Sequence, residues 1–544
     1  MRSIKYLFRL WRKRKPSKTK SGTDKTGGPY NQVQMLSPDL SVNLKMIREK
    51  LGNSMDFIIR EFNIGKTRAA LVCIDGLVDK EMIESHILQP MLIYARMAEP
   101  TPVKGEKELL KFIEDNTLTV LDYQELSSLD KLLDKIFSGY TILIIDGIAV
   151  TLAIETIGYE ARDVTEPETE SVVRGPREGF TERLQVNIAL LRRKIKSPDL
   201  RLERMTLGEV TRTDICIAYI RGIADDKIVD EVKKRLQRIE IDGILESGYI
   251  EGFIEDAPFS LFPTVGNTEK PDVLAGKLLE GRVAIFVDGS PMVLTLPYLF
   301  MENLQASEDY YSRWPSGSIS RWLRFLAIFF TTLLPPLYVA VISYNPELLP
   351  TILMITVAAS RAGIPFPPVL EVTLLGAIFE ILREAGVRQP RPVGQAVSIV
   401  GVLVIGQAAI SAGIVSAPGV MIVALTGISS FAVPAQTAAY VFIRLFLLAL
   451  TATTGFFGLT IGIIILLVHL TSLRSFGVPY MSPLAPINVA GWKDLFLRAP
   501  WWAMVGRPAV IARQNRKRIG SVTMPGPPRG KAEKPLGGED EDNA

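Results

Sequence analysis

The apolar stretch from Trp322 to Leu473 limits what this chain can fold into more than any other feature. It opens with WLRFLAIFFTTLLPPLYVAVISY and closes with AAYVFIRLFLLALTATTGFFGLTIGIIILLVHL. A helix that crosses the hydrocarbon core of a bilayer needs about 20 predominantly apolar residues, and both runs reach that length. We therefore expect residues 322–473 to form an all-α polytopic membrane domain.

The remaining chain is charged and has the composition of soluble protein. With 544 residues, the chain exceeds the size of a single compact core. Its net charge of +4 is small, and basic and acidic residues are interspersed through the soluble part, so we expect no nucleic-acid partner. These properties predict several soluble units joined to the membrane domain.

Two blocks of the amino-terminal half follow the same pattern. The runs RAALVCIDGLVDKEMIESHILQPML and TDICIAYIRGIADDKIVDEVKKRLQRI each contain a β-rich segment, a glycine turn and a helical pattern. Each block is followed by an Asp-Gly pair between apolar runs, Asp146-Gly147 and Asp288-Gly289, which is a strong hairpin signal. The sequence therefore predicts an α/β soluble amino-terminal region of two related subdomains.

The segments around these units complete the expected organisation. Polar, low-complexity composition predicts disorder at both ends of the chain, and the aromatic and basic cluster YYSRWPSGSISRW is typical of a membrane interface. The expected units are a basic leader (1–38), the first α/β subdomain (39–170), a linker helix with the GPREGF motif (171–199), the second α/β subdomain (200–305), a pre-membrane interface segment (306–321), the membrane domain (322–473), a juxtamembrane segment (474–510) and a tail (511–544).

Motifs of the common enzyme classes are missing from the sequence. The chain has no GxxxxGK[ST] phosphate loop, no GxSxG and no HExxH, and its two histidines are far apart. Cys73 and Cys216 stand inside apolar runs and are expected in the core. We therefore expect no enzymatic activity, no cofactor and no metal site.

Three glutamates stand in the apolar run VLEVTLLGAIFEILREAG: Glu371, Glu380 and Glu384. By helical phase, Glu380 and Glu384 share a face, and Glu371 points to the opposite side. Rings of acidic side chains favour cations in channels, so these three residues are candidates for an ion path or its selectivity. The helix that carries them is either a broken span or a re-entrant or interfacial helix.

The last apolar run, about 436–472, places polar and small residues on a single helical face. Small residues permit close helix packing, and an arginine at membrane depth needs a partner or water. This face is either a helix interface within one protomer or the wall of an aqueous path. Its candidate residues are Arg444, Thr451, Gly455, Gly458 and Gly462.

The GPREGF motif precedes an amphipathic helix in which apolar positions alternate with arginines. One interpretation is a linker helix that packs between the two subdomains. The other is a contact surface for a partner or a neighbouring subunit, with Arg177, Glu178 and Phe180 as the contact residues.

Basic residues beside the apolar runs predict the orientation of the chain. Under the positive-inside rule, the segment after Leu473 is cytosolic, and a soluble region without an export signal stays on the same side. An even number of spans follows. We expect four, one of them at about 393–415.

Four stretches resemble the A subunits of the GerA-type spore germination receptors. They are RGPREGFTERLQVNIALLRRKI, APFSLFPTVGNTEKPD, FMENLQASEDYYSRW and REAGVRQPRPVGQAVSIVGVLVIGQAAISAGIVS. They agree with the family in order and spacing, within a similarity that covers roughly residues 40–490. The stage V sporulation AF proteins, a related branch, are similar over the same region.

The resemblance implies a multi-pass protein of the spore inner membrane that works beside receptor B and C subunits. It implies that A subunits form homo-oligomers, as pentamers, which open as cation channels when a nutrient germinant binds. The soluble region is then expected on the cytosolic, spore-core side. In the AF branch, the channel would instead amplify the germination signal.

Two other classes compete with a channel. Broken helices at membrane depth are also found in secondary transporters, although the membrane domain shows no inverted repeat. The alternative is a non-conducting membrane scaffold for partner subunits, in which the α/β subdomains carry the function.

Overall fold

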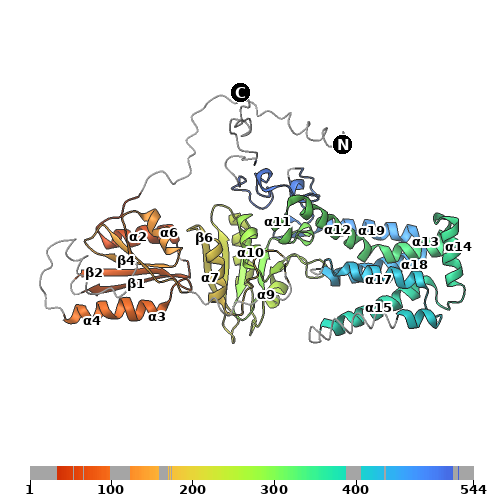
Figure 1. The fold of residues 1–544 in the computed structure, drawn as a ribbon, viewed down its shortest axis with the longest axis horizontal. Coiled ribbons are helices and arrows are strands. Elements are labelled where there is room, and N and C mark those ends of the chain that lie inside the picture. The colour runs from red at the N-terminus through yellow and green to blue at the C-terminus, as the bar shows by residue number, and fades with distance from the viewer. Residues whose placement is uncertain are drawn as a thin grey trace, which may run out of the picture.

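Two α/β subdomains and a helical domain follow one another along an elongated molecule (Figure 1). In Figure 1, the first subdomain is red to orange, the second is yellow to green, and the helical domain is green to blue. The computed structural model describes residues 34–52, 54–64, 67–97, 123–158, 170, 172, 174–387, 406–433, 436–489, 491–518 and 525.

The first subdomain is a five-stranded antiparallel sheet with helices on both faces. Its strand order is β1-β2-β4-β5-β3, and every neighbouring pair is antiparallel. Helices α2 and α6 cover one face, and α3, the π-helical turn η1 and α4 cover the other (Figure 1). The elements are α2 (Leu40–Leu51), β1 (Phe57–Ile64), β2 (Thr67–Ile74), α3 (Lys80–Ile83), η1 (Glu84–Leu88), α4 (Gln89–Met97), β3 (Tyr123–Leu126), α6 (Leu129–Ile136), β4 (Tyr140–Ile145) and β5 (Thr151–Glu155).

The β2 strand shows why the sequence reads as a continuous apolar run. Successive side chains of a strand point to opposite faces of the sheet. Ala70 and Val72 pack with α2 and α6, whereas Leu71 and Cys73 pack with the helices of the other face. Because helices cover both faces, neither set of positions needs polar residues.

The second subdomain repeats this architecture. Its strand order is β6-β7-β9-β10-β8, which matches the first sheet strand for strand. Helices α8 and α9 pack on one face, and α7 and α10 pack on the other. The elements are α7 (Leu184–Lys194), β6 (Leu200–Leu207), β7 (Thr213–Ile220), α8 (Asp226–Gln237), α9 (Ser247–Ile254), β8 (Gly266–Thr268), α10 (Pro271–Leu279), β9 (Val283–Val287) and β10 (Val293–Leu296).

Both Asp-Gly pairs form the predicted hairpin turns, between β4 and β5 and between β9 and β10. Their glycines have φ values of +90° and +85°, a region that glycine enters without steric cost. Each aspartate also accepts a hydrogen bond from the start of a helix. The Leu40 N–H donates to Asp146 at 3.0 Å, and the Leu184 N–H donates to Asp288 at 3.1 Å.

The residue-level repeat extends to the segments before α2 and α7. Asn43 bonds the backbone of Ser37, and Asn187 bonds the backbone of Thr181 in the same way. The helix expected as a linker in 171–199 is thus the counterpart of α2. It packs on the second sheet as the first helix of the second subdomain because its apolar side carries Leu184, Ile188 and Leu191.

A buried ion pair joins the two subdomains. Arg192 of α7, 2% exposed, bonds both carboxylate oxygens of Asp56 at 2.8 and 3.1 Å. Ser54 accepts a further bond from Arg192 at 3.2 Å. Arg201 of β6 donates to the backbone carbonyls of Lys50 and Leu51 at the end of α2. The subdomains therefore meet through a fully partnered polar contact.

Short helices lead from the second subdomain into the helical domain, where most helices are shorter than expected. The α12–α13 pair is bent by 49° just before Pro335 and Pro336, and proline is a common cause of such kinks. The elements are η2 (Phe300–Leu304), α11 (Glu308–Tyr311), α12 (Trp314–Thr332), α13 (Leu334–Tyr344), η3 (Pro346–Leu348), α14 (Thr351–Arg361), α15 (Pro368–Val387), α17 (Ala417–Ser430), α18 (Thr437–Thr454) and α19 (Phe456–Ser472).

The expected single helix over 436–472 is wrong. Gly455, with φ +61°, ends α18 and starts α19. The two helices then pack against each other as a hairpin, with Gly462 facing Leu447 and Leu450. A residue with positive φ cannot lie inside a right-handed helix, so the single polar face proposed from the sequence does not exist.

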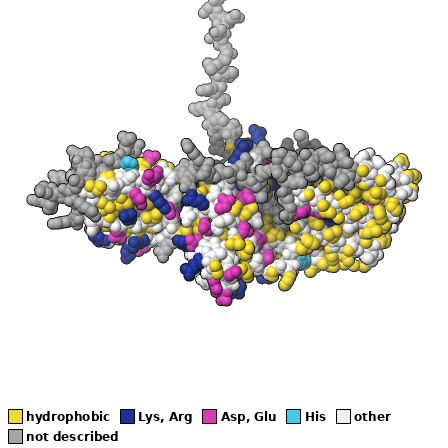
Figure 2. All heavy atoms as spheres, turned by 90° about the horizontal axis from the view of Figure 1, so that it is seen from below, with side chains coloured by type: hydrophobic (Ala, Val, Ile, Leu, Met, Phe, Trp, Pro, Cys, Tyr) yellow, Lys and Arg dark blue, Asp and Glu magenta, His cyan; other side chains and the backbone are white. Residues whose placement is uncertain are grey.

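Among the described helices, α18 is the one that is both long and apolar enough to cross a bilayer unaided. The bent pair α12–α13 adds a second if it counts as one span, while α14, α17 and α19 are apolar but shorter. Most of the expected span at 393–415 lies outside the described residues. Seen from below, apolar side chains cover the helical end of the molecule, and charged ones are spread over the α/β end (Figure 2).

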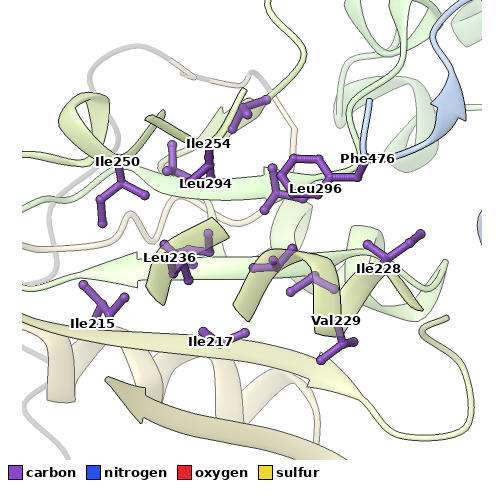
Figure 3. Packing of buried hydrophobic residues seen from close by; sticks show 14 of the residues in the cluster. Ile215, Ile217, Ile228, Val229, Leu236, Ile250, Ile254, Leu294, Leu296 and Phe476 are labelled. Atoms are coloured by element: carbon purple, nitrogen blue, oxygen red, sulfur yellow. The ribbon is translucent and has the colours of Figure 1, made fainter. Parts of the chain in front are cut away.

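Residues 474–518, called here the carboxyl-terminal strap, return from α19 to the second subdomain. They begin with a small hairpin of β11 (Arg474–Ser475) and β12 (Val478–Pro479), and two short 3-10 helices follow, η5 (Gly491–Asp494) and η6 (Trp501–Ala503). Phe476 packs beside Leu296 in the core of the second subdomain (Figure 3). Ile511, fully buried, enters the same core.

Candidate functional site in the helical domain

Glu371 belongs to the first turn of α15. Its side chain lies against the start of α17, where α14, α15 and α17 meet. It is fully buried and forms an ion pair with Arg361. The N–H and hydroxyl of Ser416, the N-cap residue of α17, both donate to its carboxylate, at 2.6 and 2.5 Å. A carboxylate is stabilised at a helix N-terminus by free N–H groups and the helix dipole. Glu371 therefore holds three helices together in this chain.

Gly419 shows how closely α17 approaches this carboxylate. A Cβ at position 419 would lie 2.3 Å from the Glu371 carboxylate, so the contact requires glycine. Arg361 also reaches the Tyr338 hydroxyl, at 3.4 Å.

Glu380 lies on the opposite side of α15 and pairs with two arginines. Arg444 of α18 approaches it to 3.1 Å, and Arg383 to 2.7 Å. Arg444 is 6% exposed, and its guanidinium lies beside Gly376 of α15. Glu380 is thus the partner of the buried Arg444.

Glu384 is the exposed member of the three glutamates. The structure therefore separates the candidates by burial: Glu371 is fully buried, Glu380 is partly buried, and Glu384 lies exposed on the outer side of α15. One protomer does not bring them together as a single site.

The small residues of α18 and α19 lie inside their hairpin. A Cβ at Gly458 would lie 2.2 Å from the Leu450 carbonyl oxygen, and one at Gly462 would lie 2.5 Å from Leu447. Thr451 is fully buried, and its hydroxyl donates to the Leu447 carbonyl at 2.7 Å. These positions allow the two helices to approach each other within one chain.

The GPREGF residues take different positions from those expected of a subunit contact. Phe180 is 6% exposed and packs edge-on against Phe286, with the ring centroids 5.5 Å apart. Glu178 pairs with Arg193 and Lys194 at 3.3 and 3.2 Å. Of the three predicted contact residues, Arg177 is the exposed one. Phe180 cannot serve as a surface contact because its ring completes the core of the second subdomain.

The amino-terminal half of α12 carries a buried polar cluster that the sequence did not predict. Arg321, 2% exposed, binds Asp309 at 3.1 Å and Asp494 of the strap at 2.7 Å. Tyr310 donates to Asp494 at 2.8 Å, and burial raises the pKa of the Asp494 carboxyl, an effect that Arg321 opposes. The aromatic and basic composition of 306–321 suggested a lipid anchor, but Asp309, also buried, was the sign of an internal ion pair.

Most of the chain is similar in sequence to known spore proteins. Residues 45–510 match the family model of the Bacillus/Clostridium GerA spore germination protein. Spore germination protein KA of Bacillus subtilis (strain 168) is 47% identical over 498 residues, which cover 91% of this chain and 90% of that protein. Stage V sporulation protein AF of the same organism is 33% identical over 475 residues, covering 87% and 94%.

A solved structure also matches part of the chain. The N-terminal domain of the A subunit of the Bacillus megaterium spore germinant receptor GerK3 is 42% identical, covers 49% of this chain and 98% of that domain, and aligns with a TM-score of 0.39.

The chain has a duplicated α/β region followed by a helical domain. The helical domain has an apolar exterior and ion pairs in its interior. The chain belongs to the GerA family of spore germination proteins.

Proposed function

We propose that this chain is the A subunit of a nutrient germinant receptor. In this proposal, copies of the chain assemble in the spore inner membrane, beside B and C subunits, into a cation channel that opens on germinant binding and triggers germination. The soluble region lies on the spore-core side. The greater identity to the spore germination protein KA than to the AF protein supports the receptor branch over the amplifying branch.

The observation that carries the channel proposal is a stripe of exposed residues on α15. Its members recur at spacings of four, three, four and three, the heptad pattern by which helices associate. Four are apolar, and the last is acidic. They are Leu370, Leu374, Ala377, Ile381 and Glu384.

The opposite side of α15 packs on α17 through Val372 and the Glu371 contact, so the stripe is the side open to another subunit or to a path between subunits. A ring of Glu384 carboxylates, one from each copy, favours cations. Glu371 and Glu380, which the sequence analysis grouped with Glu384, support the pore helix through their ion pairs instead.

The experiment begins with the oligomeric state of the detergent-solubilised full chain, followed by bilayer recordings on the same sample. Glu384→Gln is expected to lower cation selectivity without changing the oligomer. Glu347→Gln, in the exposed turn η3, is the matched control and should leave the current unchanged. A monomer without current would favour a scaffold that requires its partner subunits. A conducting oligomer unaffected by Glu384→Gln would remove Glu384 from the path.

A further inference from the structure

The loop between α9 and β8 exposes two large apolar side chains next to the helical domain. Phe259 is fully exposed, at 101% of its reference area, and Leu261 is 48% exposed. Exposing a phenylalanine completely leaves its whole apolar area in contact with water. Pro258 and Pro263 bracket the tip, and proline restricts the backbone, so little ordering is needed to present these side chains.

The loop is fixed to the end of α19. The Ser260 hydroxyl lies 2.9 Å from His469 Nε2, in the last turn of that helix. The Phe262 ring lies 6.2 Å from the His469 ring and is buried among the residues that join the helical domain to the second subdomain. Phe259 and Leu261 therefore lie at the level where α19 ends.

Two acidic residues, Glu255 and Asp256, precede the tip of the loop and do not belong to it. Asp256 is paired with Arg235 at 2.8 Å, and burial raises the pKa of Glu255. The tip itself, from Ala257 to Phe262, has no charged residue.

We propose that Phe259 and Leu261 insert into the headgroup region of the bilayer that surrounds the helical domain, and so hold the second subdomain against the membrane surface. This inference rests on the membrane location in the proposed function. The occupant is a lipid surface, because the loop continues the apolar exterior of α19, on which Ile464 and Val468 are 54% and 61% exposed.

The test uses the full chain in phosphatidylcholine nanodiscs, with Phe259→Cys labelled by an environment-sensitive fluorophore and quenched by spin-labelled lipid. The native cysteines stay unlabelled because both are buried, and burial raises the pKa of the Cys73 thiol to about 11 and raises that of Cys216 as well. Ile464→Cys on α19 is the positive control. Val210→Cys, 79% exposed in the turn between β6 and β7, is the matched control on the same subdomain.

The expected result is lipid quenching of the label at 259, several-fold stronger than at 210. Quenching at 464 but not at 259 would overturn this inference and leave the membrane location intact. Absence of quenching at both 464 and 259 would instead remove the membrane location on which the proposed function depends. The label at 259 could instead show a blue shift without quenching by lipid. If that blue shift disappears when each disc holds one chain, the loop contacts a second copy, and the proposal is overturned.

Discussion

Three arginines in different parts of the molecule, Arg192, Arg361 and Arg444, each pair with a carboxylate from another element of the fold. Burying one charge without a partner costs several kcal/mol, whereas a paired and hydrogen-bonded charge recovers most of that cost. Arg192 and Arg444 reach carboxylates 136 and 64 positions away, and Arg361 joins the consecutive helices α14 and α15. They therefore fix how subdomains and helices meet.

Replacing Arg192 by methionine should destabilise the junction between the subdomains by about 3–5 kcal/mol, because Asp56 then stays buried without its partner. Calorimetry of the solubilised chain measures the loss as a lower midpoint of thermal unfolding. The double variant Asp56→Leu/Arg192→Met should recover most of it. Equal losses in the single and double variants would show that the pair does not act as a unit.

At the same scale, the sequence predicts that an arginine in an apolar run needs a partner, but not which one. Glu380 is 64 positions from Arg444, and its identity as the partner depends on how α15 and α18 cross. The sequence also does not predict that Asp146 bonds to α2. Its turn is a local signal, while its bond to α2 joins residues 106 positions apart.

The α18–α19 hairpin is the element whose form departs most from expectation. Hydrophobic periodicity continues across Gly455, so composition alone favours one long helix. The reversal depends on one positive φ angle and on glycines that allow contact at the hairpin seam. By contrast, the two α/β subdomains were predictable because strand patterns and Asp-Gly turns are local and occur twice.

Gly458→Ala should lower the stability of the solubilised chain by about 1–3 kcal/mol, the typical cost of overpacking. The added methyl group would meet the Leu450 carbonyl at 2.2 Å, so the hairpin must open. Gly363→Ala is the control, since no atom lies within 4 Å of a Cβ at that position. The thermal midpoint of each variant measures the effect, and an unchanged midpoint for Gly458→Ala would contradict the tight seam.

At the scale of the whole molecule, the strap restricts the topology. The second subdomain precedes the helical domain in the chain, and the strap follows it, yet the two share one core through Phe476 and Ile511. Both must lie on the same face of any membrane that the helices cross. We therefore expect an even number of crossings, the same expectation that the charge distribution gives.

Cysteines introduced at Val210 and at Arg513 of the strap, both exposed, should react with an impermeant maleimide from the same side of sealed vesicles. Vesicles of inverted orientation should lose both signals together. Labelling of the two positions from opposite sides would show an odd number of crossings and would contradict the packing of the strap.

The strap also ties the folding of the soluble region to the order of synthesis. Ile511 leaves the ribosome about 215 residues after Leu296, a delay of roughly 10–40 s at 5–20 residues per second. During that interval the core of the second subdomain lacks Phe476 and then Ile511. We therefore expect the newly made subdomain to remain incomplete until the strap has been synthesised, so that a chain truncated within the helical domain would carry an open, protease-sensitive core.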